Sequence, residues 1–405
     1  MLLRIHLSFI FIFSFGLASY AQPGLVVSYT MDDCTFTDVQ SGLDGSTFGS
    51  DQCDCGVSSN AFMFDGLIQT AVLDTGVTTI LSGDWTFSMY VQVDFQGTEN
   101  VDLLHLGNGC NLDSVFTLRY LPNSRRFRFF LNDSPRNEVM LDGIADDNSC
   151  WQYLVITKEG PLAKIYINGV LQEEDSAESD LRLNVGGLLK VSNSPCQLSA
   201  INPDVKFEGL IDEFKIYNRA LTEREIGDID LRPDKIRTRD TTIFIGSSLR
   251  LTSGGSCSSD FEWSPSTFLD DPDLLNPIAT PDEDITYTLT VRGDGCESID
   301  QVTVRVADPS TLNCDQLVLP SAFTPNDDRI NDEYGISSQF LISDLESFEI
   351  FNRWGGRVFF TDDLTGTWDG TYQGEQAPAT SYVYQVVYLC SGERFNKSGI
   401  VNLIR

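Results

Sequence analysis

Histidine is almost absent from this chain, which has only His6 and His105 among its 405 residues. Zinc and copper sites depend largely on imidazole ligands, and a catalytic Ser–His–Asp triad needs a histidine as its base. His6 lies in an N-terminal segment that we expect to be cleaved off. The sequence therefore excludes most metal sites, and it excludes any such triad that does not use His105.

Basic residues and long apolar runs are also scarce. The chain has 27 Lys and Arg against 59 Asp and Glu, for a net charge of −32. Such a charge repels nucleic acid and anionic membranes, so we predict that neither is a partner. Beyond the N-terminal segment no stretch is apolar enough to cross a bilayer as a helix, so we predict no transmembrane segment.

The segment before Gln22 has the pattern of a secretory signal peptide. Arg4 is basic, Leu7 to Leu17 form an apolar run too short to span a bilayer, and Ser19-Tyr20-Ala21 is a small-residue cleavage site. We therefore predict that residues 1–21 are a cleaved signal peptide and that the mature protein is exported.

The rest of the composition is typical of an extracellular, all-β protein with several modules. The 32 glycines and 26 phenylalanines suit short strands joined by tight turns, and the length predicts two to three domains. All ten cysteines follow the cleavage site, and an even number in an exported chain indicates disulfides. The sequence contains no CxxC pair and no Cys/His zinc pattern.

Five ordered motifs fill the last part of the chain: LPSAFTPNDDRINDEY from Leu319, FEIFNRWGGRVFF from Phe348, GTWDGTYQGE from Gly366, SYVYQVVY from Ser381 and GIVNLIR from Gly399. Apolar runs on both sides of Gly355-Gly356 predict a β-hairpin, and the alternation from Tyr382 to Tyr388 predicts a strand. The series resembles the C-terminal sorting domain that Bacteroidetes attach to cargo of the type IX secretion system, also called the gliding-motility-associated C-terminal domain.

This resemblance implies an immunoglobulin-like β-sandwich at residues 315–405 that acts as an export address, with the type IX secretion machinery as its partner. The residues that match the family's motifs are Phe323, Pro325, Asn326, Asp328, Asn331, Asp332, Arg353, Trp354, Gly355, Trp368, Asp369, Gly370, Tyr382, Tyr384 and Arg405. Two motifs depart from the family pattern, both in turns: residues 325–329 read PNDDR where the family has PNGDG, and Thr380 stands where the family has glycine.

Residues 22–230 contain FMFDG from Phe62, WTFSMYVQVD from Trp85, WQYLVITKEGPLAKIYINGVL from Trp151 and FEGLIDEFKIYNRALTEREI from Phe207. Alternation after Trp85 predicts a strand with one apolar and one polar face, and Asn168-Gly169 predicts a hairpin. Thr222 with Glu225 predicts a capping box at the domain's one helix. The segment resembles the laminin-G-like, or concanavalin-A-like, jelly-roll family, which implies two stacked antiparallel sheets.

Glu173, Asp175 and Glu178 match the Glu-x-Asp-x-x-Glu spacing of laminarinase-type enzymes of the same fold class, which cleave β-glucans. In those enzymes the intervening positions are apolar because they face the core, whereas here they are Glu174, Ser176 and Ala177, within the run QEEDSAESD. We interpret the three carboxylates as a solvated acidic loop, and we predict no catalytic residues.

Jelly-roll domains of this kind often hold a structural Ca²⁺ ion, which takes six to eight oxygen ligands. By position in the family pattern the candidate ligands are Asp32, Asp38 and Asp212. The alternative for Asp212 is that it accepts backbone hydrogen bonds and binds no ion. Tyr120, Trp151 and Tyr153 are aromatic residues of the kind that stack on sugar rings, but we interpret each as core packing.

Residues 238–307 resemble the immunoglobulin-like or PKD-like repeats that often precede this sorting domain, which implies a spacer. We predict a half-buried strand at residues 286–291, and linkers at Arg232-Pro233 and Asp308-Pro309-Ser310. The predicted fold class is therefore all-β: an N-terminal two-sheet jelly roll followed by two immunoglobulin-like β-sandwich modules.

Two disulfides can be predicted from spacing, since pairing inside a module lets each module fold alone. These are Cys257–Cys296, on either side of Trp263, and Cys314–Cys390, and each should contribute about 4 kcal/mol by the chain-entropy model. The alternative is free, buried thiols. The pairing of the six N-terminal cysteines stays open: Cys34, Cys53, Cys55, Cys110, Cys150 and Cys196.

Together these patterns predict a secreted, surface-exposed binding protein without enzymatic activity, whose jelly roll recognises a glycan or an extracellular protein. Two alternatives remain open at this point. One is a glycoside hydrolase of the same fold, and the other is a structural component of a surface layer or biofilm. The sequence does not name the ligand, the oligomeric state, or whether the protein is anchored to the cell or released.

Overall fold

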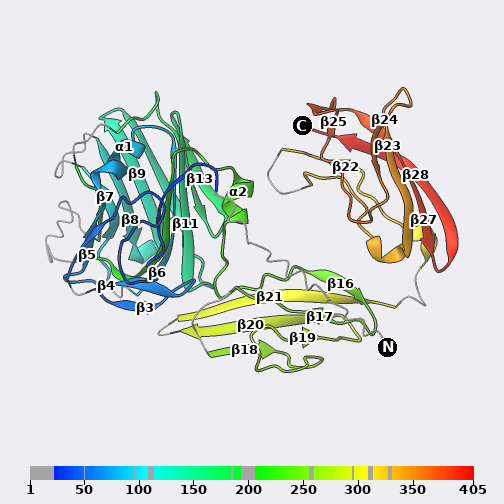
Figure 1. The fold of residues 1–405 in the computed structure, drawn as a ribbon, viewed down its shortest axis with the longest axis horizontal. Helices are drawn as coiled ribbons and strands as arrows, with labels where there is room; N and C mark the ends of the chain where they lie inside the picture. Colours follow the sequence, from blue (N-terminus) through cyan, green and yellow to red (C-terminus); the bar gives the residue numbers. More distant parts are fainter. Residues whose placement is uncertain are drawn as a thin grey trace, which may run out of the picture.

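The computed structural model describes residues 22–49, 51–94, 97–107, 114–183, 187–192, 206–254, 260–293, 296–308, 313–326 and 331–405. Three β-rich bodies follow one another along the chain: a jelly roll, a small sandwich and a C-terminal sandwich (Figure 1). The prediction of an all-β fold is confirmed. The predicted signal peptide and the motif residue Asp328 lie outside the described residues. Within these ranges no helix is long and apolar enough to cross a membrane.

The jelly roll consists of two antiparallel sheets. Sheet A has the order β13-β12-β11-β6-β15-β4-β3, and β1 also pairs with β15. Its strands are β1 (Leu25–Tyr29), β3 (Cys53–Cys55), β4 (Asn60–Asp65), β6 (Trp85–Val93), β11 (Trp151–Glu159), β12 (Leu162–Ile167), β13 (Val170–Ser176) and β15 (Glu208–Tyr217). The predicted hairpin joins β12 to β13, and both turn residues, Asn168 and Gly169, have the positive φ that a two-residue hairpin turn demands.

Sheet B has the order β10-β9-β8-β7-β14-β5-β2. Its strands are β2 (Ser46–Phe48), β5 (Thr70–Val72), β7 (Val101–Leu106), β8 (Val115–Leu121), β9 (Arg126–Ser134), β10 (Asn137–Ile144) and β14 (Lys190–Val191). The two sheets pack through a core rich in aromatic rings, in which Phe87 of sheet A contacts Phe116 of sheet B at a centroid distance of 5.1 Å. This inter-sheet core is the main hydrophobic cluster of the jelly roll.

A second apolar cluster lies on the opposite face of sheet A. Tyr90, Tyr153 and Tyr166 pack there against Leu221 and against Ile226 of helix α2 (Glu223–Asp228). The predicted capping box begins this helix. The prediction of a single helix was wrong, because a second short helix, α1 (Thr75–Ile80), follows β5.

The covering layer explains why the polar face of β6 is buried. Thr86 donates a hydrogen bond to the Arg219 carbonyl at 2.8 Å and accepts one from the Leu221 amide at 2.9 Å. The alternation predicted for this strand is present, but its polar side chains satisfy the backbone of the segment that leads to α2 instead of facing water. Both faces of sheet A are therefore occupied.

The small sandwich, which we call the spacer after its predicted role, contains a four-stranded sheet of order β16-β21-β20-β18 and a two-stranded ladder of β17 with β19. The strands are β16 (Thr241–Phe244), β17 (Leu249–Arg250), β18 (Asp260–Ser264), β19 (Ile278–Ala279), β20 (Ile285–Gly293) and β21 (Cys296–Ala307). The predicted half-buried strand is β20, in which Tyr287, Leu289 and Val291 face a core that also holds Trp263.

The C-terminal module has a five-stranded sheet of order β22-β28-β27-β23-β24 and a small hairpin of β25 with β26. The strands are β22 (Ala322–Phe323), β23 (Asp344–Phe351), β24 (Arg357–Thr361), β25 (Thr371–Tyr372), β26 (Glu375–Gln376), β27 (Ser381–Cys390) and β28 (Glu393–Leu403). Both structural predictions for this region are confirmed: β23 and β24 form the hairpin around Gly355-Gly356, and the alternating segment is β27. Short 3₁₀ turns at Pro122–Ser124, Cys314–Gln316 and Gln339–Leu341 complete the described elements.

The disulfides confirm one prediction and correct the other. Cys314 and Cys390 are bonded, with a Cα–Cα distance of 5.8 Å. The predicted Cys257–Cys296 pair was wrong, because Cys296 is bonded to Cys150 of the jelly roll. Cys296 begins β21 at the point where the spacer meets the jelly roll, and sequence spacing carries no information on that contact.

Two of the cysteines whose pairing the sequence left open are also bonded to each other. Cys34 and Cys53 form a bridge within the jelly roll, and Cys55 is disulfide-bonded too. Cys110, Cys196 and Cys257 lie outside the described residues.

Candidate functional site

The outer face of sheet B is partly open within the described residues: Met140 is exposed, whereas Asp102 and His105 are buried. Along β7 to β10, Leu104, Leu118, Phe129 and Leu141 stand opposite one another and point into the core. Side chains alternate along a strand, so the residues next to these on β8, β9 and β10 point outward, and a register shift between Asp102 and Leu104 brings Asp102 of β7 opposite Arg119. We call six of these outward residues the candidate binding face: Asp102, Arg119, Arg128, Phe130, Met140 and Asp142.

Two arginine–aspartate pairs form the polar part of this face. Arg119 of β8 donates to Asp102 of β7 from Nε at 2.5 Å and from Nη2 at 3.2 Å. Arg128 of β9 donates to Asp142 of β10 from Nε at 2.7 Å and from Nη2 at 2.8 Å. Each pair is bidentate, which fixes the plane of the guanidinium as well as its position.

The two arginines stand directly opposite each other on β8 and β9. Like charges in that position destabilise a sheet unless each has its own counter-ion, and here each does. Hydrogen bonds from Arg128 lower the pKa of Asp142 below its ordinary value, and the same bonds raise the pKa of Arg128. The Arg128–Asp142 pair is therefore ionised throughout the physiological pH range.

The apolar part of the face lies two residues further along the same strands. Phe130 of β9 stands between Thr117 of β8 and Met140 of β10, and Met140 is exposed. His105 of β7 stands on the other side of Thr117, but it is buried, and burial lowers its pKa. An aromatic ring, a thioether and planar charged groups thus share one surface.

Two of the three carboxylates with glucanase-like spacing accept hydrogen bonds from a neighbouring strand. Glu173 and Asp175 lie on β13, the edge strand of sheet A, and not in a loop as we predicted. Glu173 accepts a hydrogen bond from the Asp142 amide at 2.6 Å, and Asp175 accepts one from the Met140 amide at 3.3 Å. Both side chains therefore satisfy backbone donors of β10, which is the edge strand of sheet B. Glu178 follows β13 and is exposed.

The candidate calcium ligands are engaged in other ways. Asp38 accepts hydrogen bonds from the amides of Ser28, Gln40, Ser41 and Leu43. Burial acts to raise the pKa of Asp38, but these bonds outweigh it and lower the pKa. Both oxygens of this carboxylate are therefore committed to the turn that they organise.

Asp212 is buried and accepts the Val57 amide at 2.7 Å and the Glu213 amide at 2.8 Å. Burial raises the pKa of Asp212 to about 7. Asp32 is exposed. The described residues contain no group of three or more His, Cys, Asp or Glu that could hold a metal, and calcium binding stays a prediction.

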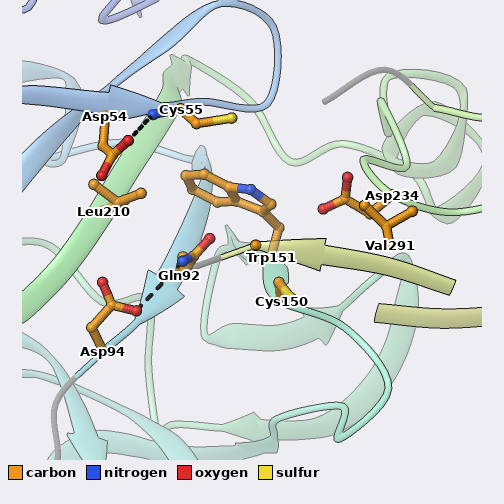
Figure 2. Close-up of a pocket in the computed structure, with 10 residues that line it drawn as sticks. Asp54, Cys55, Gln92, Asp94, Cys150, Trp151, Leu210, Asp234 and Val291 are labelled. Atoms are coloured by element: carbon orange, nitrogen blue, oxygen red, sulfur yellow. Dashed lines mark hydrogen bonds between the residues drawn. The ribbon is translucent and has the colours of Figure 1, made fainter. Parts of the chain in front are cut away.

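A crevice lies where the jelly roll meets the spacer. Figure 2 shows the Trp151 ring at its centre, with Asp54 and Leu210 to one side and Asp234 to the other. The crevice encloses about 70 Å³, well below the several hundred Å³ of typical ligand pockets, and Trp151 is only 4% exposed. We interpret it as part of the packed junction.

A larger space of about 260 Å³ also borders Trp151 and is lined by Tyr90 and Tyr153 among others. These two rings stack on each other at 4.6 Å, and the Tyr90 hydroxyl donates to Asp230. Neither ring offers an open face to a sugar. Tyr120, Trp151 and Tyr153 are all buried, which confirms their interpretation as core residues.

Two stretches of this chain match known protein families. Residues 67–227 match the concanavalin A-like lectin/glucanases superfamily. Residues 317–403 match the type IX secretion signal domain. The chain carries both domains. The resemblances inferred from the motifs at its two ends are thereby confirmed, and the secretion signal domain marks the protein for export to the cell surface or the medium.

The solved structures that match this chain are only distantly similar to it. Domain 4 of the GH43 extracellular arabinanase AbnA from Geobacillus stearothermophilus, solved with arabinotriose, is 19% identical, with a TM-score of 0.40 over 51% of this chain and 98% of its own. The binding domain of botulinum neurotoxin DC is 10% identical, with a TM-score of 0.43 over 94% of this chain and 93% of its own.

The CBM40 domain of a Ruminococcus gnavus sialidase is 18% identical, with a TM-score of 0.32 over 38% of this chain and 85% of its own. At these scores the likenesses say nothing about what this chain binds. No curated protein sequence matches the chain with significance.

Sequence reasoning missed the candidate binding face. The signal that could have found it is the alternation Arg126-Phe127-Arg128-Phe129, in which every second residue is basic on a strand whose other face is aromatic. The partner carboxylates Asp102 and Asp142 lie on neighbouring strands, so only the register of the sheet brings them to the arginines.

Proposed function

We propose that this chain is an exported, non-enzymatic binding protein whose concanavalin A-like domain recognises a glycan on the candidate binding face. The observation that carries the proposal is this partly exposed face, where two bidentate arginine–aspartate pairs lie beside Phe130 and the exposed Met140. The match of residues 67–227 to the concanavalin A-like lectin/glucanases superfamily supports a carbohydrate as the ligand class.

Sugar chemistry suits these groups. Neighbouring hydroxyls of a sugar ring can donate to a carboxylate and accept from a guanidinium in parallel, and the C–H face of the ring packs against aromatic and thioether surfaces. Because the bidentate aspartate already holds each guanidinium in one orientation, the arginine side chains lose little conformational entropy when a ligand binds. Arg128 is 39% exposed, so it can reach a ligand while paired.

The glycosidase alternative receives no support from the site. Glu173 and Asp175 are bound to backbone amides of β10. A retaining or inverting hydrolase needs one carboxyl group held as an acid and a second one facing it across a cleft. No observation on the described residues favours such a pair, and we propose binding without hydrolysis.

Glycan-array screening of the full chain tests the proposal, with Arg128→Ala as the decisive variant. Asp142 keeps a second partner, Arg126, at 3.3 Å, so the variant should stay folded. We expect a loss of binding of about tenfold or more, as for a central contact residue. Arg119 is unsuitable because its removal would leave Asp102 as a buried, unpaired charge.

Arg292→Ala is the matched control. Arg292 lies in the spacer, is 40% exposed and also bonds to carboxylates on its own sheet, so its removal should leave glycan binding unchanged. Equal binding by the Arg128 variant and the wild type would contradict the proposed site. If the wild type binds only extracellular matrix proteins, the proposed ligand class is wrong.

A further inference from the structure

The secretion signal domain contains a groove beside a free strand edge, and this groove has no role in the proposed glycan recognition. It encloses about 360 Å³ and lies between the turn that joins β23 to β24 and the hairpin of β25 with β26. Trp354, Val358, Tyr372, Pro378 and Tyr382 provide its apolar lining. Trp354 is 82% exposed, the most exposed of the large hydrophobic residues in the described chain.

The turn holds this exposed tryptophan in a fixed position. The Asn352 side chain accepts hydrogen bonds from the Trp354 amide at 3.0 Å and from the Gly356 amide at 2.9 Å. The Asn352 amide donates to the Gly356 carbonyl, and the Asn352 carbonyl accepts from the Gly355 amide. Gly355 has a φ of 80°, a backbone conformation that favours glycine. The Arg353 guanidinium lies over the Trp354 ring at 5.3 Å and donates to Thr380 at 2.9 Å. The ring is therefore presented to solvent by a well-braced turn.

The strand beside the groove is unpaired along one edge. β24 is the last strand of its sheet, and β23 is its only partner among the described strands. Such an edge exposes backbone N–H and C=O groups that can pair with an added strand. Val358 of β24 lines the groove, so a strand added at this edge would place its side chains beside Trp354 and Tyr372. The opposite edge of the sheet, β22, has only two residues.

The charges at the groove favour an acidic segment. Arg353 lines the groove, and Arg405 donates at 2.5 Å to the carbonyl of Ala377, another lining residue. Glu375 is the one acidic residue among the lining residues of the described chain. Arg353 and Glu375 balance each other, so Arg405 leaves one unbalanced positive side chain beside the groove of a protein whose net charge is −32.

We propose that this groove and the edge of β24 are the docking site for the type IX secretion machinery, and that the occupant is an extended, acidic and apolar peptide segment of one of its proteins. Strand addition would supply backbone hydrogen bonds, while insertion of an apolar side chain between Trp354 and Tyr372 would supply specificity. The site rests on the matched secretion signal domain and not on glycan binding.

The test uses the full chain expressed in a host with a working type IX system, with protease accessibility on intact cells as the readout. Trp354→Ala should reduce the surface-exposed or released fraction about tenfold and leave protein in the periplasm. Ile400→Ala is the control, since it removes an apolar side chain that is 62% exposed in the same module but outside the groove. It should be exported like the wild type.

Two further measurements separate docking from misfolding and from self-association. Both purified variants should keep the wild-type melting temperature, because each removed side chain lies mostly in solvent. A photo-crosslinking amino acid at position 354 should give an adduct with a secretion protein, and the same label at position 400 should not. Normal export of Trp354→Ala, equal retention of both variants, or a crosslink only to a second copy of this chain would overturn the proposal. Glycan binding should be unchanged in both variants, so this result is independent of the proposed function.

Discussion

The disulfide between Cys150 and Cys296 should contribute a large part of the spacer's free energy of unfolding. The spacer is joined to the jelly roll through the chain near residue 231 and through this disulfide. The Leu231 amide donates to the Tyr90 hydroxyl of the jelly roll at 2.6 Å, so the chain is anchored there. If the spacer alone unfolds, the bridge closes a loop from residue 231 to residue 296, a difference of 65 residues.

The chain-entropy model assigns such a loop about 4 kcal/mol, and about 5 kcal/mol if both modules unfold and the loop spans the full 146-residue separation. A module of roughly 70 residues has a net stability of only about 4 to 10 kcal/mol. Non-covalent contacts at the junction remain when the bridge is removed. The Ile299 amide donates a hydrogen bond to the Asn148 carbonyl at 3.1 Å. The Lys235 amino group donates to the Asn148 carbonyl and to the Ile299 carbonyl.

We therefore expect the Cys150→Ala/Cys296→Ala variant to lower the melting temperature of the spacer by roughly 15 °C or more in scanning calorimetry, and to separate its transition from that of the jelly roll. Cys314→Ala/Cys390→Ala is the control: it removes a bridge of comparable separation, 76 residues, and should lower only the transition of the secretion signal domain. A spacer transition within a few degrees of the wild type would refute the reasoning.

Two smaller predictions concern the jelly roll. Gly56→Ala should lower its free energy of unfolding by roughly 1–3 kcal/mol in urea titration, because a Cβ would lie 2.5 Å from the backbone of Asn60. The control is Gly293→Ala in the spacer, where a Cβ would meet open space, and it should change the free energy of unfolding by no more than about 0.5 kcal/mol. The folded state resists protonation of buried His105, so wild-type stability should fall relative to His105→Gln as pH drops below about 6.5, the unfolded pKa. Parallel stability curves from pH 7.5 to 5 would show that His105 is not the cause.

The candidate site shows where sequence reasoning stops. The pattern around Arg128 shows that the residue is on a strand and points away from the core, but it does not show that Asp142 lies opposite it. The same limit explains the interpretation of Glu173 as part of a solvated loop. Its partner is the amide of Asp142, 31 residues earlier in the chain and on the other sheet.

The sequence by itself determined the local structure and the export address of this protein. Hairpin turns such as Asn168-Gly169, the capping box at Thr222 and the alternation in β27 depend on residues close together in the chain, and each was confirmed. The motifs of the secretion signal domain are equally local, as is the Cys314–Cys390 bridge, which stays inside one module.

Tertiary structure alone decided which surfaces are open and which modules are joined. The polar face of β6 is buried because the segment leading to α2 covers it, while the outer face of sheet B stays accessible at Arg128 and Met140. Cys296 reaches Cys150 because two modules meet at that point. The physical reason is the same in each case: these contacts join residues far apart in sequence. Hydrophobic periodicity shows which face of a strand packs on the core, but it does not show what lies against the other face.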